Sequence, residues 1–135
     1  MADKKIVLVI EDSLQDAELL RQIVLKVPYD FEAVLAESAE EAVRYLNEAE
    51  LGKCKKPVLL FLDLFLPGIT GLDFLKAFHH NPSFKNVTVI VLTGSEDKQD
   101  FLASYKNGAA FFMKKPYKID DILGVLGQLK VTGRF

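Results

Sequence analysis

Five short apolar runs alternate along the chain with longer segments in which apolar residues recur every three or four positions. The runs are rich in β-branched and aromatic residues and are bounded by turn residues, which is typical of buried strands. These predicted strands are residues 5–10, 31–36, 58–63, 87–92 and 109–113. The predicted helices are residues 14–27, 39–47, 71–80, 97–107 and 119–129. Strict strand–helix alternation with short connections predicts an α/β fold, a parallel sheet with helices on both faces.

Local signals place the ends of several helices. Ser13 and Ser38 are predicted N-caps, and Glu41, three residues after Ser38, completes the pattern of a capping box. Residues 48–56 are predicted to be a polar connector. The apolar residues expected on or near buried helix faces are Leu14, Ala17, Leu20, Ile23, Val24, Val27, Ala39, Ala42, Val43, Leu46, Leu51, Leu72, Leu75, Ala77 and Phe78.

Composition narrows the class of protein. A chain of 135 residues with half of them hydrophobic suits one globular domain, and no apolar run is long enough to span a membrane. The charged N-terminus, MADKK, lacks the apolar region of a signal peptide. A single cysteine, Cys54, excludes an internal disulfide, is predicted to be a loop thiol and fits the reducing cytoplasm. With a net charge of -2 and no basic stripe, direct binding of nucleic acid is not expected.

Polar residues follow four of the predicted strands at the point where each strand ends. Glu11 and Asp12 follow the first strand, Asp63 ends the third, Thr93 follows the fourth and Lys115 comes after the fifth. The carboxyl ends of parallel strands lie at one edge of the sheet, where ligands of open α/β folds bind. We therefore expect three acids, one hydroxyl and one ammonium group to meet at that edge.

Carboxylates that lie close together repel one another, so their negative charge has to be balanced by positive groups nearby. Two like charges about 5 Å apart repel by roughly 3 kcal/mol at an effective dielectric constant near 20. Lys115 offsets one negative charge, and a hard divalent cation such as Mg²⁺ would offset others. Asp63 then becomes a candidate nucleophile that forms an aspartyl phosphate, with Thr93 and Lys115 donating hydrogen bonds to the phosphoryl oxygens. The plain alternative for Asp63 is an aspartate that caps a helix or forms a turn.

Four motifs together resemble the receiver domains of two-component response regulators. They are VLVIEDS, LFLDLFLPGITG, VIVLTGS and FFMKKPY, in this order along the chain. The resemblance implies a flavodoxin-like, doubly wound, five-stranded parallel sheet of order 2-1-3-4-5 with five helices. It also implies that residues 1–135 are a single, chemotaxis-receiver-like receiver domain without an output domain. The connector 48–56 is similar to that of single-domain receivers associated with bacteriophytochrome kinases.

The resemblance implies a role for each residue at the strand ends. Asp63 would accept a phosphoryl group from a sensor histidine kinase or a phosphotransfer protein in the cytoplasm. Asp12 would bind Mg²⁺ directly, and Glu11 would do so through water. Asp63 and the main-chain carbonyl of Phe65 would complete the protein ligands of the metal. Such a protein promotes its own phosphorylation and dephosphorylation but is not a conventional enzyme.

The resemblance also implies a switch. Thr93 would be the switch hydroxyl, Phe112 the switch aromatic residue and Lys115 the contact to the phosphoryl group, with a cis peptide bond before Pro116. The alternative for Phe112 is an ordinary core residue. Phosphorylation would reshape the surface formed by residues 97–129, which would bind a separate protein partner or form a homodimer. Lys114 is expected to be a surface lysine, and His79 and His80 are expected to face solvent.

In the family that the chain resembles, the position of Phe65 often borders the attacking water, and we hypothesise that this bulky apolar residue slows hydrolysis of the aspartyl phosphate. Three other functions remain open from the residues. One is a receiver-like interaction module that is never phosphorylated. Another is a phosphatase with an aspartyl nucleophile, although such enzymes carry a second acid where this chain has Phe65. The third is a flavin carrier, whose first loop attracts phosphate, whereas Glu11 and Asp12 would repel it.

Overall fold

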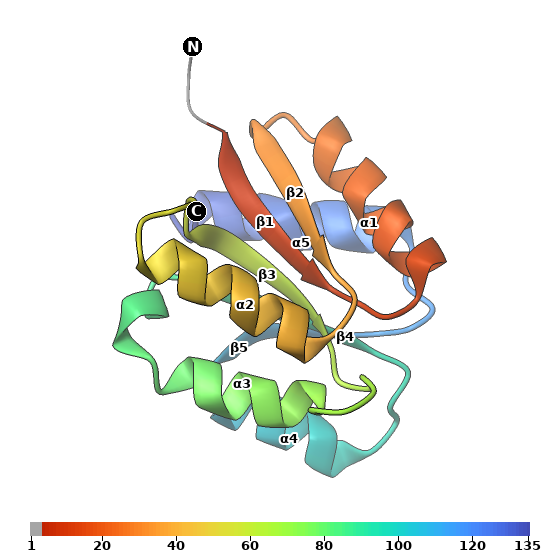
Figure 1. Ribbon diagram of the computed structural model, residues 1–135. Helices are drawn as coiled ribbons and strands as arrows, with labels where there is room; N and C mark the ends of the chain where they lie inside the picture. The colour runs from red at the N-terminus through yellow and green to blue at the C-terminus, as the bar shows by residue number, and fades with distance from the viewer. Residues whose placement is uncertain (1–3) are drawn as a thin grey trace.

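The computed structural model describes residues 4–135 and contains one five-stranded parallel sheet (Figure 1). Its strands are β1 (Lys5–Ile10), β2 (Phe31–Ala36), β3 (Pro57–Asp63), β4 (Thr88–Thr93) and β5 (Ala109–Lys114). The spatial order is β2-β1-β3-β4-β5, so the predicted α/β fold and strand order are confirmed. The charged N-terminal sequence discussed above falls partly on residues 1–3, which lie outside the described residues.

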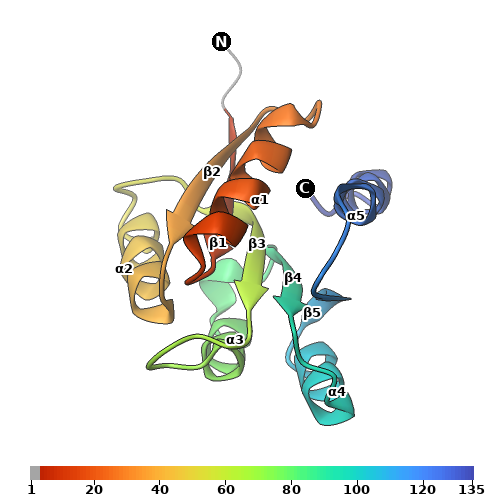
Figure 2. The ribbon, with the colours of Figure 1, turned by 90° about the vertical axis from the view of Figure 1, so that its right-hand side faces the viewer.

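Helices cover both faces of the sheet. They are α1 (Leu14–Lys26), α2 (Ala39–Glu50), α3 (Gly71–His79), α4 (Lys98–Lys106) and α5 (Ile119–Val131), with a 3₁₀ turn at Pro82–Phe84. Figure 2 shows α1 and α5 on one face and α2, α3 and α4 on the other. None of the helices in residues 4–135 is long and apolar enough to cross a membrane.

The side chains of the central strands alternate between two apolar cores. On β1, Val7 and Val9 pack with α1 and α5, whereas Leu8 and Ile10 pack with α2 and α3. All four are at most 1% exposed. This burial on both faces explains why the strands are continuous apolar runs rather than alternating ones. It also makes the sheet a stiff support for whatever its strand ends carry.

Three of the helices begin at hydroxyl caps. The side chains of Ser13, Ser38 and Thr70 each accept a hydrogen bond from a backbone N–H in the first turn. The predicted capping box at Ser38 is only half formed, because the Glu41 carboxylate accepts from the N–H of Glu37 instead. Such caps satisfy amide groups that have no partner inside the helix and so fix where each helix starts.

Several expectations about burial and length were wrong. Helix α2 continues to Glu50, so the predicted connector 48–56 begins three residues too early. This extra turn buries Ala49, whereas Val43 is 40% exposed and Leu51, beyond the helix end, is 72% exposed. Helix α3 buries Phe74 in place of Ala77.

The remaining burial predictions concern the start of α1, helix α4 and residues outside the central strands. The expected burial of Leu14 was wrong, since this residue at the first position of α1 is 67% exposed. Helix α4 is largely exposed, with Ser104 as its one buried residue. His79 and His80 are exposed and Cys54 lies in the loop before β3, as expected.

Gly71 allows α3 to begin directly against the end of β3. A Cβ atom at this position would lie 2.1 Å from the carbonyl oxygen of Asp63 and 2.5 Å from the Cα of Leu64. Both distances are far inside van der Waals contact, and both involve backbone that cannot turn away. The N–H of Gly71 also donates to the carbonyl of Leu64 at 3.0 Å. The position of Asp63 therefore depends on a glycine eight residues later.

We predict that Gly71→Ala destabilises the fold by at least about 2 kcal/mol, as expected for overpacking against rigid backbone. The matched control is Gly124→Ala in α5, where an added Cβ meets nothing within 4 Å. It should stabilise the protein by about 0.5–1 kcal/mol, because alanine favours a helix interior. Urea unfolding followed by circular dichroism measures both. Equal effects of the two substitutions would contradict the importance of the contact.

Candidate functional site

Strand register brings the polar residues together at the carboxyl edge of the sheet. Ile10 of β1 pairs with Leu62 of β3, so the next residues, Glu11 and Asp63, are neighbours. On the other side, Thr93 of β4 pairs with Lys114 of β5. β1 and β3 also lie where the chain order reverses, which is the usual ligand crevice of this architecture.

Lys115 connects the acids of this edge. Its ammonium nitrogen lies 2.7 Å from Glu11 Oε2, 3.0 Å from Asp16 Oδ2 and 3.1 Å from Asp63 Oδ2. Its own backbone N–H donates to the carbonyl of Thr93 at 2.7 Å. The lysine is therefore fixed at both ends. Of the sequence-predicted site residues, Glu11, Asp63 and Lys115 are in direct contact.

Burial makes these charges interdependent. Glu11 is 2% exposed and Asp63 is 6% exposed. Desolvation raises the pKa of Glu11 to about 7, even though hydrogen bonds from Lys115 and from the N–H of Ser13 oppose the rise. Burial alone would lower the pKa of Lys115, but its hydrogen bonds with Glu11, Asp16 and Asp63 outweigh this and raise it. Lys115 thus stays protonated, and Glu11 is the group that titrates near neutral pH.

Three of the acids lie close enough to share a cation. Carboxylate oxygens of Glu11, Asp12 and Asp63 lie within 4.8 Å of one another, and Asp12 is exposed to solvent. Three oxygen donors with one open side suit a hard divalent cation that keeps several waters. Glu11 and Asp63 now share Lys115, which compensates their charge, so a cation would have to compete with that ammonium. The donor set fits the predicted metal site.

The two predicted switch residues, Thr93 and Phe112, contact α4 and the loop before it. Thr93 is fully buried, and its hydroxyl oxygen accepts a hydrogen bond from the N–H of Ser95 at 3.2 Å. Phe112 is half-buried, and its ring lies 5.4 Å from that of Phe101 on α4. The N–H of Phe112 donates to the hydroxyl of Tyr105 at 3.2 Å. Phe112 is thus connected to α4, and Thr93 is connected to the loop that precedes α4.

Phe65 touches the site through its backbone. Its N–H donates to Asp63 Oδ1 at 2.9 Å, while its side chain is 58% exposed. One oxygen of Asp63 is thereby held by Phe65 and the other by Lys115. Lys114, as expected, is a surface residue, paired with Glu96. The Lys115–Pro116 peptide bond is cis, as the resemblance implies.

Sequence reasoning missed Asp16. This residue lies in the first turn of α1, and its backbone N–H donates to the capping Ser13. The signal was present, since an acid three residues after a serine cap is the second half of a capping box. A capping box would direct the carboxylate of Asp16 back to the start of α1. The capping pattern gives no indication that this carboxylate contacts a lysine 99 residues away.

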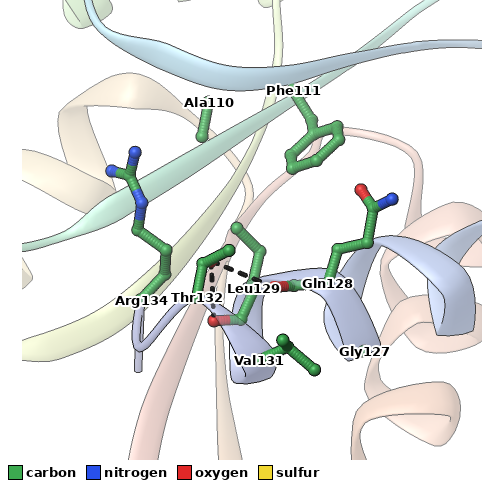
Figure 3. A pocket seen from close by; sticks show the side chains of 8 residues that line it. All are labelled: Ala110, Phe111, Gly127, Gln128, Leu129, Val131, Thr132 and Arg134. Carbon is green, nitrogen blue, oxygen red and sulfur yellow. Dashed lines mark hydrogen bonds between the residues drawn. The ribbon is translucent and has the colours of Figure 1, made fainter.

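A hollow in the surface lies apart from the predicted site residues. Its volume is about 670 Å³, and Figure 3 shows it between the start of β5 and the last turn of α5. Its lining residues are Ala110, Phe111, Gly127, Gln128, Leu129, Val131, Thr132 and Arg134. The hydroxyl of Thr132 donates to carbonyls of its own helix, and the lining also carries the polar side chains of Gln128 and Arg134. It includes none of the predicted site residues.

Comparison with protein-family models finds a match to the response regulator receiver domain over residues 7–126. The response regulator Rcp1 of Synechocystis sp. is 29% identical over 119 residues, which are 87% of this chain and 81% of Rcp1. The crystal structure of its Mn²⁺-bound form has a TM-score of 0.79 and 28% identity, covering 93% of this chain and 91% of that one.

Two further solved structures have the same architecture. The bacteriophytochrome response regulator AtBRR has a TM-score of 0.78 and 28% identity, covering 96% of this chain and 95% of its own. The phosphorylated cyanobacterial phytochrome response regulator RcpA has a TM-score of 0.80 over 95% of this chain and 92% of its own, and its 24% identity shows the fold alone. The predicted similarity to bacteriophytochrome-type receivers is therefore confirmed.

We predict that divalent cations bind more weakly as the pH falls below 7. The raised pKa of Glu11 means that, between the ordinary value of 4.5 and about 7, the folded chain holds a proton that the unfolded chain lacks. Glu11 therefore makes the metal-free fold more stable as the pH is lowered from 7 toward 4.5. Protonation of Glu11 also opposes metal binding, because a metal ligand has to be the deprotonated carboxylate. The dissociation constant for Mn²⁺ should be about tenfold higher at pH 6 than at pH 8.

Isothermal titration calorimetry at both pH values measures this effect. The Glu11→Gln variant is the control, and it should show little dependence on pH over the same range. An unchanged dissociation constant in the unsubstituted protein would exclude Glu11 from the metal site.

Proposed function

This chain belongs to the response regulator receiver domain family, and from that premise we propose that it accepts a phosphoryl group on Asp63 in a two-component or phosphorelay pathway. One observation carries the proposal. Asp63 is a nearly buried carboxylate at the carboxyl end of β3, held by the N–H of Phe65 and the ammonium of Lys115. Holding a reactive group in a fixed orientation lowers the entropic cost of transfer.

The donor in this proposal is a phosphohistidine of a sensor histidine kinase or of a phosphotransfer protein. A carboxylate oxygen of Asp63 forms a bond to phosphorus as the bond from phosphorus to the histidine nitrogen breaks, and the histidine leaves. Lys115 lies 3.1 Å from Asp63, where its charge can stabilise the transferred group. The same chemistry with water as acceptor removes the phosphoryl group, so the protein promotes its own dephosphorylation without being a conventional enzyme.

Mg²⁺ is the cofactor that we propose for this site. Asp12 and Asp63 would hold it directly, Glu11 through water, and the main-chain carbonyl of Phe65 would be the remaining protein ligand. When bound, it neutralises part of the negative charge on the transferring phosphoryl group. The crystal structure of the similar protein Rcp1 is a Mn²⁺-bound form, which supports a divalent cation as the cofactor.

The output follows from the residues beside the site. Phosphorylation adds about two negative charges at pH 7. We expect the hydroxyl of Thr93 to leave the N–H of Ser95 and donate to a phosphoryl oxygen, and Phe112 to turn into the space that Thr93 vacates. Phe112 contacts Phe101, and its N–H is bonded to Tyr105, so its movement would change the exposed α4 surface.

That surface, made by α4, β5 and α5, is where we propose that the signal leaves the domain. The recipient is a separate protein or a second copy of this chain, and the pathway is cytoplasmic. The similarity to bacteriophytochrome response regulators favours a bacteriophytochrome kinase as the phosphoryl source.

We predict that acetyl phosphate with Mg²⁺ adds one phosphoryl group, about 80 Da, to the protein and that Asp63→Asn abolishes this addition. Asparagine keeps the shape of the side chain but is a far poorer nucleophile than a carboxylate. Intact-protein mass spectrometry gives the readout. Asp73→Asn, an exposed acid in the first turn of α3, is the control and should be labelled normally. No labelling of the unsubstituted protein would favour the interaction module that is never phosphorylated.

We also predict that Phe65→Asn shortens the lifetime of the aspartyl phosphate by roughly tenfold, or about 1.4 kcal/mol in activation free energy. The Phe65 side chain is apolar and lies two residues after the acceptor, whereas asparagine can orient an attacking water. Release of inorganic phosphate from labelled protein follows the decay. Leu51→Ala, which removes another exposed apolar side chain at the C-terminal end of α2, should leave the lifetime unchanged. Equal lifetimes for all three proteins would disprove the shielding hypothesis.

A further inference from the structure

The ammonium group of Lys115 has no donor left for a new partner. A lysine offers three N–H donors, and here three carboxylates lie at 2.7, 3.0 and 3.1 Å. Two of these, on Glu11 and Asp63, belong to the acid cluster of the site. The third, on Asp16, does not, and nothing in the proposed chemistry requires it.

The first turn of α1 explains why Asp16 reaches Lys115. Asp16 occupies the helix position whose carboxylate normally turns back to the N–H of the capping residue. In this chain that N–H, on Ser13, donates to Glu11 Oε1 at 3.1 Å. Glu11 has taken the place of the acid in the capping box. The carboxylate of Asp16 is thereby released from the helix start and lies 3.0 Å from the ammonium of Lys115.

Asp16 holds the lysine from the solvent side. Its side chain is 41% exposed, compared with 3% for Glu11 and 7% for Asp63. It lines a hollow between α1 and the segment after β5, together with Leu19, Lys115, Pro116 and Tyr117. The N–H of Lys115 that donates to Asp16 is therefore directed away from the acid cluster.

We propose that Asp16 is a positioning residue that restrains Lys115, so that an incoming phosphoryl group must compete with it for the ammonium. This inference rests on the proposed function, because it concerns the same lysine and the same acceptor. A cation bound to the acid cluster would engage Glu11 and Asp63 but would leave Asp16 unaffected. Asp16 is thus the carboxylate that stays on Lys115 when the other two change partners.

Removing the Asp16 charge has two consequences, and both favour binding of a phosphoryl group near Lys115. One N–H donor of Lys115 becomes available to a phosphoryl oxygen, and one negative charge near the incoming anion disappears. Because the pair is partly exposed, the expected gain is modest, roughly two- to fivefold in affinity for a phosphoryl mimic.

The experiment measures binding of beryllofluoride in saturating Mg²⁺ by two-dimensional NMR, with the full chain. Asp16→Asn should lower the dissociation constant by two- to fivefold relative to the unsubstituted protein. The side-chain ammonium signal of Lys115 should shift in the same variant before beryllofluoride is added. Asp16→Glu, which restores the carboxylate, should return the dissociation constant toward its original value.

Glu18→Gln is the matched control. It removes the same charge from the same helix, but Glu18 pairs with Arg21 and has no contact with Lys115. This variant should leave both the dissociation constant and the Lys115 signal unchanged. A similar gain in Glu18→Gln would mean that overall charge, rather than the contact with Lys115, controls binding.

The outcomes separate this inference from the proposed function. If the unsubstituted protein fails to bind beryllofluoride in Mg²⁺, the proposed function fails. If it binds, and Asp16→Asn binds equally or more weakly, Asp16 does not compete for Lys115 and the present inference is overturned. Weaker binding would mean that Asp16 helps Lys115 to reach the phosphoryl group instead of competing with that group.

Discussion

One ammonium group shared by three carboxylates is the interaction on which this site depends. Glu11 and Asp63 are almost completely removed from water, and two uncompensated carboxylates so close together would strongly oppose folding. Lys115 makes their burial tolerable, and it does so from the far end of the chain, 104 residues after Glu11. The same contact leaves the acids ionisable and oriented, so the interaction that permits folding also prepares the acceptor.

The sheet converts chain order into this arrangement. Each of the predicted acids, Thr93 and Lys115 ends a strand or comes directly after one, and parallel register places the ends of neighbouring strands side by side. Gly71 then allows α3 to begin against the carbonyl of Asp63. The acceptor is therefore enclosed by backbone that has little freedom to move. In contrast, Thr93 is bonded to Ser95 in the loop before α4, and Phe112 is bonded to Tyr105 of α4, which is largely exposed.

Most of the fold could be predicted from the sequence, because the features that define the strands and helices are local in the chain. Apolar runs and capping residues define the elements, and strand alternation with short connections restricts their order. The proximity of Glu11, Asp63 and Lys115 could be predicted for the same reason, because each of them lies at or just after the end of a parallel strand. The carboxylate of Asp16 could not be placed in this way, because its direction depends on Glu11 occupying the N–H of Ser13. The direction of the Thr93 hydroxyl likewise depends on the turn that contains Ser95. The length of α2 was missed because Ala49 gives a weak apolar signal although it is buried.

The exposed surface of α4 has a consequence for how such a protein can change over generations. Ser104 is the one buried residue of this helix, so substitutions at its exposed positions are nearly neutral for stability. Leu102, which is 55% exposed, can therefore be exchanged, whereas Phe101 and Tyr105 are constrained by their contacts with Phe112. Duplicated copies of the gene would be free to diverge in partner choice while keeping the same chemistry.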